Sequence, residues 1–152
     1  MITVETKDVP QANSLSKVCD LLALVDSGIE NESELMKELD LVRREIGYYK
    51  HAARILGFSA YGDGQFSISA KGHELLSSTT PEQVRRRLSG AVRSSELFQD
   101  LFSDCGNDQP SKAQVISFLL RRTQLNKTTA SRRAASMLSW LKTIRQTTMG
   151  DE

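Results

Sequence analysis

Hydrophobic residues recur every three to four positions through most of the chain, and this periodicity predicts a mainly helical protein. The first helical stretch runs to about Ser27. Asn13 or Ser14 can serve as its N-cap, and Gly28 supplies its stop. The pattern therefore indicates an amphipathic first helix that buries one face.

Two further helices are predicted between residues 31 and 57. Asn31 is followed three residues later by Glu34, the spacing of a capping box, which indicates a short second helix. Asp40 is the expected cap of the third helix, which Gly57 closes. The second and third helices together form a helix-turn-helix. The face of the third helix that we expect to be buried consists of Leu41, Ile46, Tyr49, Ala52, Ala53 and Leu56.

After Gly57 the period of the pattern changes from that of a helix to that of a strand. Apolar residues alternate with small or polar ones on both sides of the loop 61–65, which predicts a β-hairpin. A short helix is predicted over residues 70–78. Three helices followed by a hairpin is the order of a winged helix-turn-helix.

The second half has helical patterns alone, at about 81–91, 95–103, 111–122 and 128–146. The last two are separated by only about five residues, which predicts a second, all-helical helix-turn-helix. We therefore expect a mainly α protein with a small β-hairpin, in which a winged-helix domain (1–80) is followed by a helical domain (81–152) packed on it.

Composition excludes several classes of protein. No apolar run approaches the length of a membrane span, and the N-terminal sequence lacks a secretory signal, so we expect a cytoplasmic protein without a membrane partner. Cys19 and Cys105 are isolated from each other and from both histidines, which argues against a zinc site or a disulfide. No nucleophile elbow, phosphate-binding loop or nuclease carboxylate cluster is present. We expect no catalysis, no metal and no cofactor.

Charge is distributed unevenly behind an overall net charge of +1. Residues 1–80 contain 8 Lys and Arg against 12 Asp and Glu, whereas residues 81–152 contain 12 against 7. Between Gln109 and Gly150 there is no acidic residue at all. A field of one sign suits a polyanion such as a nucleic acid, although solvated faces of ordinary helices are the alternative.

The third helix carries the first candidate contacts. The helix after the turn of a winged helix enters the major groove with its N-terminal residues at the base edges. We expect Arg43, Arg44 and Gly47 to approach DNA, and Lys50 or His51 to contact a phosphate. The acidic residues Glu38, Asp40 and Glu45 lie nearby and oppose this interpretation.

The start of the last helix is the second candidate. If Asn126 or Thr128 caps it, unpaired backbone N–H groups and the positive end of the helix dipole lie beside hydroxyl and basic side chains. Trp140, further along, is expected to be a core residue. The candidate contacts here are Lys127, Thr128, Thr129, Ser131, Arg132 and Arg133.

Two runs of sequence resemble the winged-helix DNA-recognition region of type II restriction endonucleases. They are YYKHAARILGFSAYGDGQFSISAKGHELL and TTASRRAASMLSWLKTI. The resemblance implies that the region binds or helps to recognise DNA while a separate domain cuts it. The chain departs from that pattern because it has no cleavage domain, so nuclease activity is not carried over. The signature positions are occupied by Tyr48, Tyr49, Gly57, Arg132, Arg133 and Trp140.

Two hypotheses follow. In the first, the chain binds double-stranded DNA as a recognition module or transcription regulator of a restriction or defence system, with a separate catalytic subunit or a second copy of the chain as further partners. In the second, the winged-helix surface is a protein-interaction or dimerisation module of a larger complex and makes no contact with DNA. The acidic first half favours the second hypothesis, and the basic second half favours the first.

Overall fold

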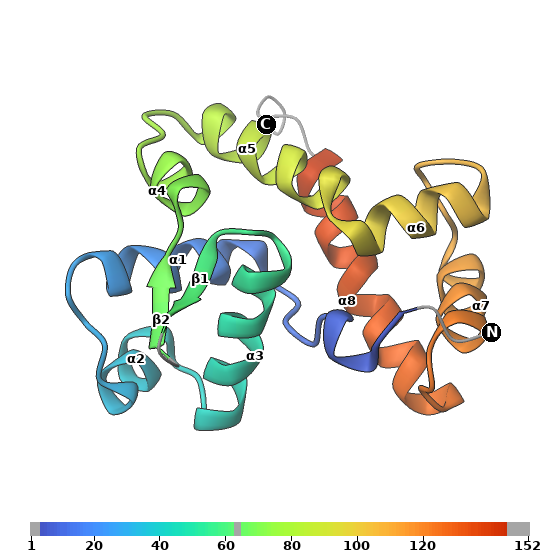
Figure 1. Cartoon of the computed structure of the whole chain (residues 1–152), viewed down its shortest axis with the longest axis horizontal. Helices are drawn as coiled ribbons and strands as arrows, with labels where there is room; N and C mark the ends of the chain where they lie inside the picture. The colour runs from blue at the N-terminus through green and yellow to red at the C-terminus, as the bar shows by residue number, and fades with distance from the viewer. Residues whose placement is uncertain (1–3, 63–64, 146–152) are drawn as a thin grey trace.

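The computed structural model describes residues 4–62 and 65–145, and it confirms a mainly α fold with one two-stranded antiparallel hairpin (Figure 1). Within these residues no helix has the length and apolar character that crossing a membrane requires. In chain order the elements are η1 (Thr6–Asp8), α1 (Leu15–Asp26), α2 (Glu32–Leu39), α3 (Arg43–Ile55), β1 (Ser59–Gly62), β2 (Gln65–Ile68), α4 (Ala70–Leu76), α5 (Pro81–Ser94), α6 (Glu96–Cys105), α7 (Lys112–Arg122) and α8 (Lys127–Arg145).

Side-chain caps begin nearly all of the described α-helices. In each case a hydroxyl or amide oxygen accepts a hydrogen bond from a backbone N–H of the first turn, which would otherwise have no partner. The predicted caps Ser14 and Asn31 are confirmed in this role. The full set of caps, from α1 and α2 to α4 through α8, is Ser14, Asn31, Ser69, Thr80, Ser95, Ser111 and Asn126.

The exception is α3, where the predicted cap at Asp40 is wrong. Asp40 instead ends α2 in a left-handed conformation with φ 55°, and its backbone N–H donates to the carbonyl of Met36. The helix begins two residues later, after Val42, whose side chain makes no capping bond. The Glu45 carboxylate accepts a hydrogen bond from the Val42 backbone N–H at 3.1 Å. Asp40 is therefore the turn residue that ends α2, and it does not cap α3.

The hairpin follows α3 as predicted, with Ser59 opposite Ile68 and Ala60 opposite Ser67. The tip of the predicted loop, residues 63–64, lies outside the described residues. The next helix, α4, packs tightly beneath the hairpin at Gly72. A Cβ there would clash with the Phe58 carbonyl, so this contact requires glycine.

The second half contains four helices, of which α8 is the longest and contacts both α5 and α7. The pair α7 and α8 is joined by residues 123–126, in agreement with the predicted second helix-turn-helix. The predicted end of the last helix at 146 lies just outside the described part of the chain. Figure 1 shows α8 running through the second half of the molecule, with its start at the same end as the start of α3.

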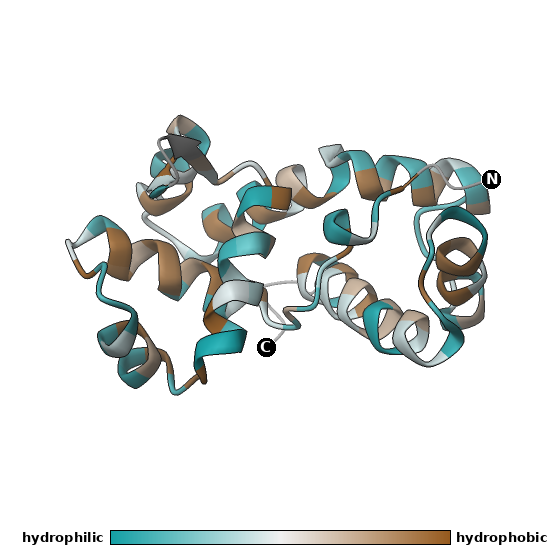
Figure 2. Cartoon of the chain, turned by 60° about the horizontal axis from the view of Figure 1, so that its bottom comes forward, coloured by the Kyte–Doolittle hydropathy of each residue, from teal (hydrophilic) through white to brown (hydrophobic). Residues whose placement is uncertain are grey.

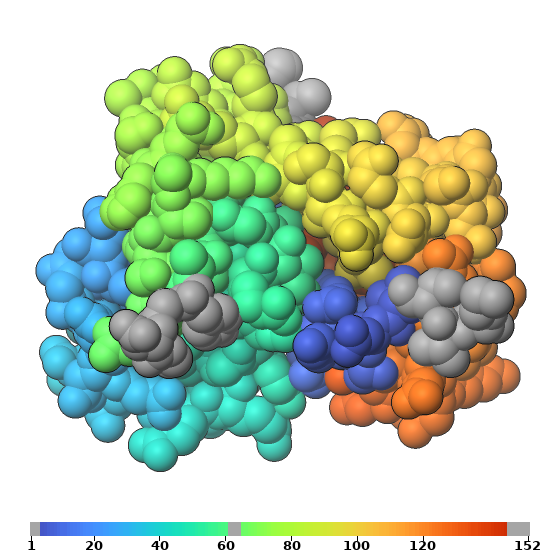
Figure 3. All heavy atoms as spheres, viewed as in Figure 1, coloured from blue at the N-terminus to red at the C-terminus, as the bar shows by residue number. Residues whose placement is uncertain are grey.

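Residues 4–13, which we call the N-terminal strap, lie between α3 and α8 (Figures 1 and 3). The strap is tied mainly to α8, because Trp140 Nε1 donates to the Ala12 carbonyl at 2.9 Å and Ser139 Oγ donates to the Asn13 carbonyl at 2.8 Å. This segment belongs to the first of the two predicted domains (1–80). The division at residue 80 stays a prediction, and the structure adds that the strap packs on the second half.

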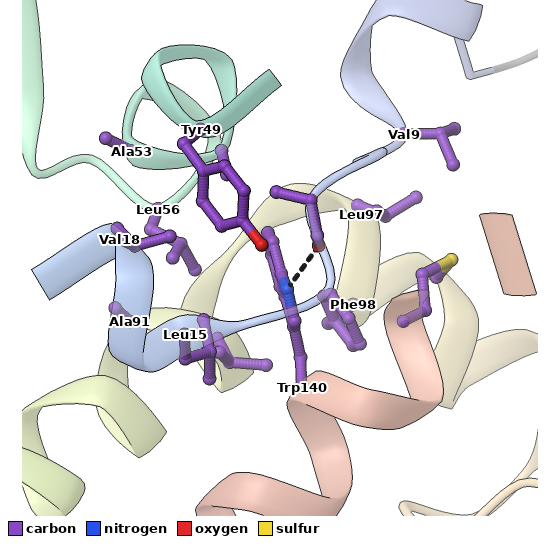
Figure 4. Close-up of a cluster of buried hydrophobic side chains, with 14 of the residues drawn as sticks. Val9, Leu15, Val18, Tyr49, Ala53, Leu56, Ala91, Leu97, Phe98 and Trp140 are labelled. Atoms are coloured by element: carbon purple, nitrogen blue, oxygen red, sulfur yellow. Dashed lines mark hydrogen bonds between the residues drawn. The ribbon is translucent and has the colours of Figure 1, made fainter. Parts of the chain in front are cut away.

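Buried side chains from both halves form one hydrophobic cluster. Trp140 is fully buried, as predicted, and its ring stacks on Phe98 with centroids 6.0 Å apart. The Tyr49 side chain of α3 points toward the same cluster, and its hydroxyl accepts from the Ser14 backbone N–H at 3.2 Å (Figure 4). Apolar and polar stretches alternate along the helices in Figure 2, as expected for amphipathic helices around a shared core.

Candidate functional site

The outer face of α3 is only partly free, because the strap crosses its second half. His51 Nε2 donates to the Lys7 carbonyl, and Arg54 pairs with Asp8 at 3.6 Å. The uncovered part of the face is therefore the start of the helix, which contains Arg44 and Gly47. This is the end that a helix-turn-helix presents to DNA bases.

His51 has an internal role in this arrangement. Arg54 Nη2 lies 3.3 Å from its Nδ1, so a neutral ring can donate through Nε2 and accept through Nδ1. Burial lowers the pKa of His51, and the nearby Arg54 guanidinium lowers it further. His51, a predicted phosphate contact, is therefore engaged within the chain, because its ring nitrogens contact the strap and Arg54.

A cleft of about 350 Å³ lies between the first half of α3, the end of the strap and the first half of α8. We call it the interhelical cleft. It brings together residues that are far apart in the sequence, and no carboxylate is among those that line it. They are Gln11, Asn13, Arg44, Tyr48, Arg132, Arg133, Ala135 and Ser136.

Arg44 and Arg132 are the two exposed cations of the interhelical cleft, and neither forms an ion pair with any described residue. Among the described residues, the side chain of Arg132 makes one long hydrogen bond, from Nη2 to Thr129 Oγ1 at 3.4 Å. Both guanidinium groups can therefore turn toward an anion that enters the cleft, without first breaking a salt bridge.

Arg133, by contrast, points inward. Its Nη1 donates to the carbonyls of Thr6 and Val9, both at 3.1 Å. Burial lowers the pKa of its guanidinium, which still remains charged at neutral pH. Arg133 therefore fixes the strap against α8, although sequence analysis placed it among the DNA contacts.

Two other predicted contacts on α3 have partners within the chain. Arg43 Nε lies 2.9 Å from a carboxylate oxygen of Glu32. The half-buried Lys50 places its Nζ 5.6 Å from the centroid of the Phe66 ring, in a cation–π contact with the hairpin. Of the four basic side chains predicted as contacts on α3, Arg44 alone is both exposed and without an ion-pair or ring partner among the described residues.

The start of α8 has the predicted cap. Asn126 Oδ1 accepts from the Thr129 backbone N–H at 2.9 Å, so Asn126 rather than Thr128 begins the helix. Lys127 and Thr128 are exposed in the first turn, and Ser131 is half-buried. Lys127 thus adds a further exposed cation at the start of the helix that carries Arg132.

Basic residues from the stretch between Gln109 and Gly150, which has no acidic residue of its own, contact an acidic residue from another helix in the fold. Arg121 and Arg122 at the end of α7 both contact Asp104 of α6, at 2.6 Å and 3.4 Å. The hydrogen bond from Arg121 holds the pKa of Asp104 below its usual range. These two arginines are therefore compensated, whereas Lys127 and Arg132 of α8 have no ion-pair partner among the described residues.

A second cleft, of about 310 Å³, lies on the other side of the strap near the end of α3. Four carboxylates line it beside Arg54, so we call it the acidic cleft. They belong to Glu5, Asp8, Glu96 and Asp100. The strap thus separates a basic cleft at the start of α3 from an acidic one at its end.

The described residues, 4–62 and 65–145, contain neither a cluster of metal ligands nor a disulfide. No cluster of His, Cys, Asp and Glu that could hold a metal ion is found there. Cys19 and Cys105 are free and half-buried, and burial raises the pKa of the Cys19 thiol to about 11. That thiol is therefore protonated at neutral pH.

Sequence reasoning missed Gln11 and Asn13 as members of the interhelical cleft. Asn13 Oδ1 accepts from Ser136 Oγ at 2.5 Å, a contact between residues 123 positions apart. The polar side of α8 that carries Ser136 was visible in the sequence. Its partner in the strap gave no local signal.

Comparison with known proteins gives one match. No curated protein and no solved structure matches the chain. A family model described as a domain of unknown function (DUF7226) matches residues 17–149, which include all but the first two residues of α1, the elements from α2 to α8, and most of the interhelical cleft. The chain therefore belongs to the DUF7226 family.

Proposed function

We propose that the chain binds duplex DNA through the start of α3 and the first half of α8. The observation that carries the proposal is that Arg44 and Arg132, two exposed and unpaired cations from different helices, line one cleft without a carboxylate. A DNA backbone presents closely spaced phosphates, and two guanidinium groups in such a cleft can hold a phosphate by charge-assisted hydrogen bonds.

In the proposed complex, the start of α3 is the part of the protein that enters the major groove. With the strap over its C-terminal half, α3 would enter a major groove with Arg44 and Gly47 leading. The acidic cleft lies at the other end of α3, where it repels phosphates and favours this orientation. The resemblance to restriction endonuclease recognition regions supports a cytoplasmic role as a recognition module or regulator.

The proposal is tested by replacing the cleft cations together. The Arg44→Ala/Arg132→Ala double variant should lower affinity for a fluorescent duplex by about tenfold or more, measured by anisotropy at about 50 mM salt. The matched control is Lys112→Ala/Lys142→Ala, which removes the same charge from exposed positions outside the cleft. Equal losses in the two double variants would show that only net charge matters. A wild-type protein that retains no duplex would overturn the proposal.

The same proposal includes binding without cleavage of the duplex. Incubation of plasmid with the protein and Mg²⁺ tests this directly. Covalently closed plasmid should remain intact, and the appearance of nicked or linear forms would contradict the proposal.

A protein-docking role is the second candidate, and the acidic cleft is the observation that favours it. If the acidic cleft is a docking site, the Glu96→Gln/Asp100→Gln double variant, which removes both charges, should change self-association in sedimentation measurements and leave duplex affinity unchanged. The DNA-binding proposal predicts no change in association and, since two repelling charges are removed, equal or slightly tighter duplex binding.

A further inference from the structure

The exposed start of α3 carries an unusual residue at its N-cap. The other described α-helices begin with Ser, Thr or Asn, whereas α3 begins with Val42, which makes no side-chain capping bond. Val42 is also 53 % exposed, and only Leu120 shares that property among the large hydrophobic residues that the structure describes. The missing cap weakens the fold, because a serine at this position would cap the helix.

Gly47, one turn further along α3, is a second residue that folding does not explain. It lies in the helix interior, where glycine is less favourable than alanine. A Cβ built on it meets nothing within 4 Å, so no neighbour in the chain requires its absence. The only other described helical glycine in such open space is Gly90, in the middle of α5.

Position on the helix relates these residues to each other. Gly47 follows Arg43 by four residues and Arg44 by three, so all three lie on one face of α3. In the next turn the strap covers this face at His51. Val42, directly before the helix, is exposed at the same end of α3 as Arg44 and Gly47, and this end lies beside the interhelical cleft.

We infer that Val42 and Gly47 form a base-reading surface of the protein. The inference rests on the proposed DNA binding and deepens it. Gly47 lets a base edge lie directly against the backbone of α3, which any side chain would hold away. The Val42 methyl groups contact the 5-methyl group of thymine, the one apolar group that the major groove displays. Arg44 holds the neighbouring phosphate.

The test uses a duplex that the wild-type protein selects from a random library, and the same duplex with uracil in place of thymine. Wild-type protein should bind the uracil duplex about fourfold more weakly, the effect of one buried methyl group. Val42→Ser should lose this discrimination, and Gly47→Ala should weaken binding to both duplexes by about tenfold. Gly90→Ala is the matched control, and its affinity should not change.

Thermal unfolding separates this role from a structural one. Val42→Ser, Gly47→Ala and Gly90→Ala should each raise Tm by about 2–4 °C, because each improves a helix. A variant that is more stable and binds more weakly places the residue at the interface.

The outcomes distinguish the inference from the proposed function. If wild-type protein binds both duplexes equally, or if Gly47→Ala binds as tightly as Gly90→Ala, the inference is overturned while DNA binding stands. If wild-type protein binds neither duplex, both are overturned.

Discussion

The starts of α3 and α8 lie on the two sides of the interhelical cleft and differ in what they offer a ligand. The start of α3 has one unpaired arginine, since Arg43 pairs with Glu32 and Glu45 caps the helix. The start of α8 carries Lys127 and Arg132, both exposed and without an acidic partner in the described structure. The first is mixed in charge and has a bare, partly apolar surface, whereas the second is positively charged.

This difference teaches that position in a motif and charge are separate signals. By its place in a winged helix-turn-helix, α3 is the expected reader of base edges. By charge, α8 is the expected holder of phosphate. In the proposed complex, α3 therefore contributes most of the sequence preference and α8 most of the salt-dependent affinity.

The largest expected effect is on the free energy of unfolding, through the packing around Trp140 that holds α3, the strap and α8 together. Trp140→Ala removes the hydrogen bond to Ala12 and the ring stacked on Phe98, and should lower the free energy of unfolding by about 3–5 kcal/mol. Denaturant unfolding followed by circular dichroism measures the change. Leu120→Ala, at an exposed position, is the control and should change stability little. A second unfolding transition, with the first half of the chain still folded after the first transition, would show that the two halves do not unfold as one unit.

The next effect separates two adjacent arginines of α8. Arg133→Ala leaves the Thr6 and Val9 carbonyls without their donor and should lower the free energy of unfolding by about 1–3 kcal/mol. Arg132→Ala should leave stability within about 0.5 kcal/mol of the wild type while weakening duplex binding. Similar losses of stability in both variants would mean that Arg132 also has a structural role.

The salt dependence of duplex affinity distinguishes the charged start of α8 from the partly apolar start of α3. Arg132→Ala should lower the slope of log affinity against log salt by about 0.9, the value for one released phosphate contact. Val42→Ser should leave that slope unchanged. Titrations at several salt concentrations measure both, and a reduced slope for Val42→Ser would assign the start of α3 a role in phosphate binding.

The smallest expected effect is on the pH dependence of stability, through His51 and its contact with the strap. Because the folded-state pKa of His51 is lowered, the unfolded chain binds more protons below the unperturbed value of about 6.5, so stability falls as pH drops below it. A protonated ring faces the cations Arg54, Arg133 and Lys7, and among the described groups Asp8 is the acid that favours it. His51→Gln should flatten the dependence of Tm on pH between about 7.5 and 5.5. An equal dependence in the variant would assign the effect to other groups.

Much of the fold could be predicted because its signals are local. The caps Ser14 and Asn31, the hairpin and the burial of Trp140 are confirmed from periodicity and residue type alone. The failure at Asp40 is also local in origin. An aspartate can end one helix in the left-handed conformation or begin the next, and the sequence pattern does not distinguish these roles.

The site could be predicted only in part, because partners across the fold decide which cations are free. Arg44 and Arg132 were named from the sequence and lie together in one cleft. Arg133 was named for the same reasons, yet the strap engages it. No pattern within α8 reveals that a segment more than 120 residues away accepts its hydrogen bonds, since the two arginines differ only by one helical step.

The strap also has a consequence for biosynthesis. Its bond from Trp140 to Ala12 spans 128 residues, and its bond from Arg133 to Thr6 spans 127. A chain emerging from the ribosome therefore exposes the strap more than 100 residues before the helix that binds it has been made. Closing so long a loop is entropically costly and slow. The α1–α3 unit can form during translation, whereas the interhelical cleft is assembled only after α8 has left the ribosome.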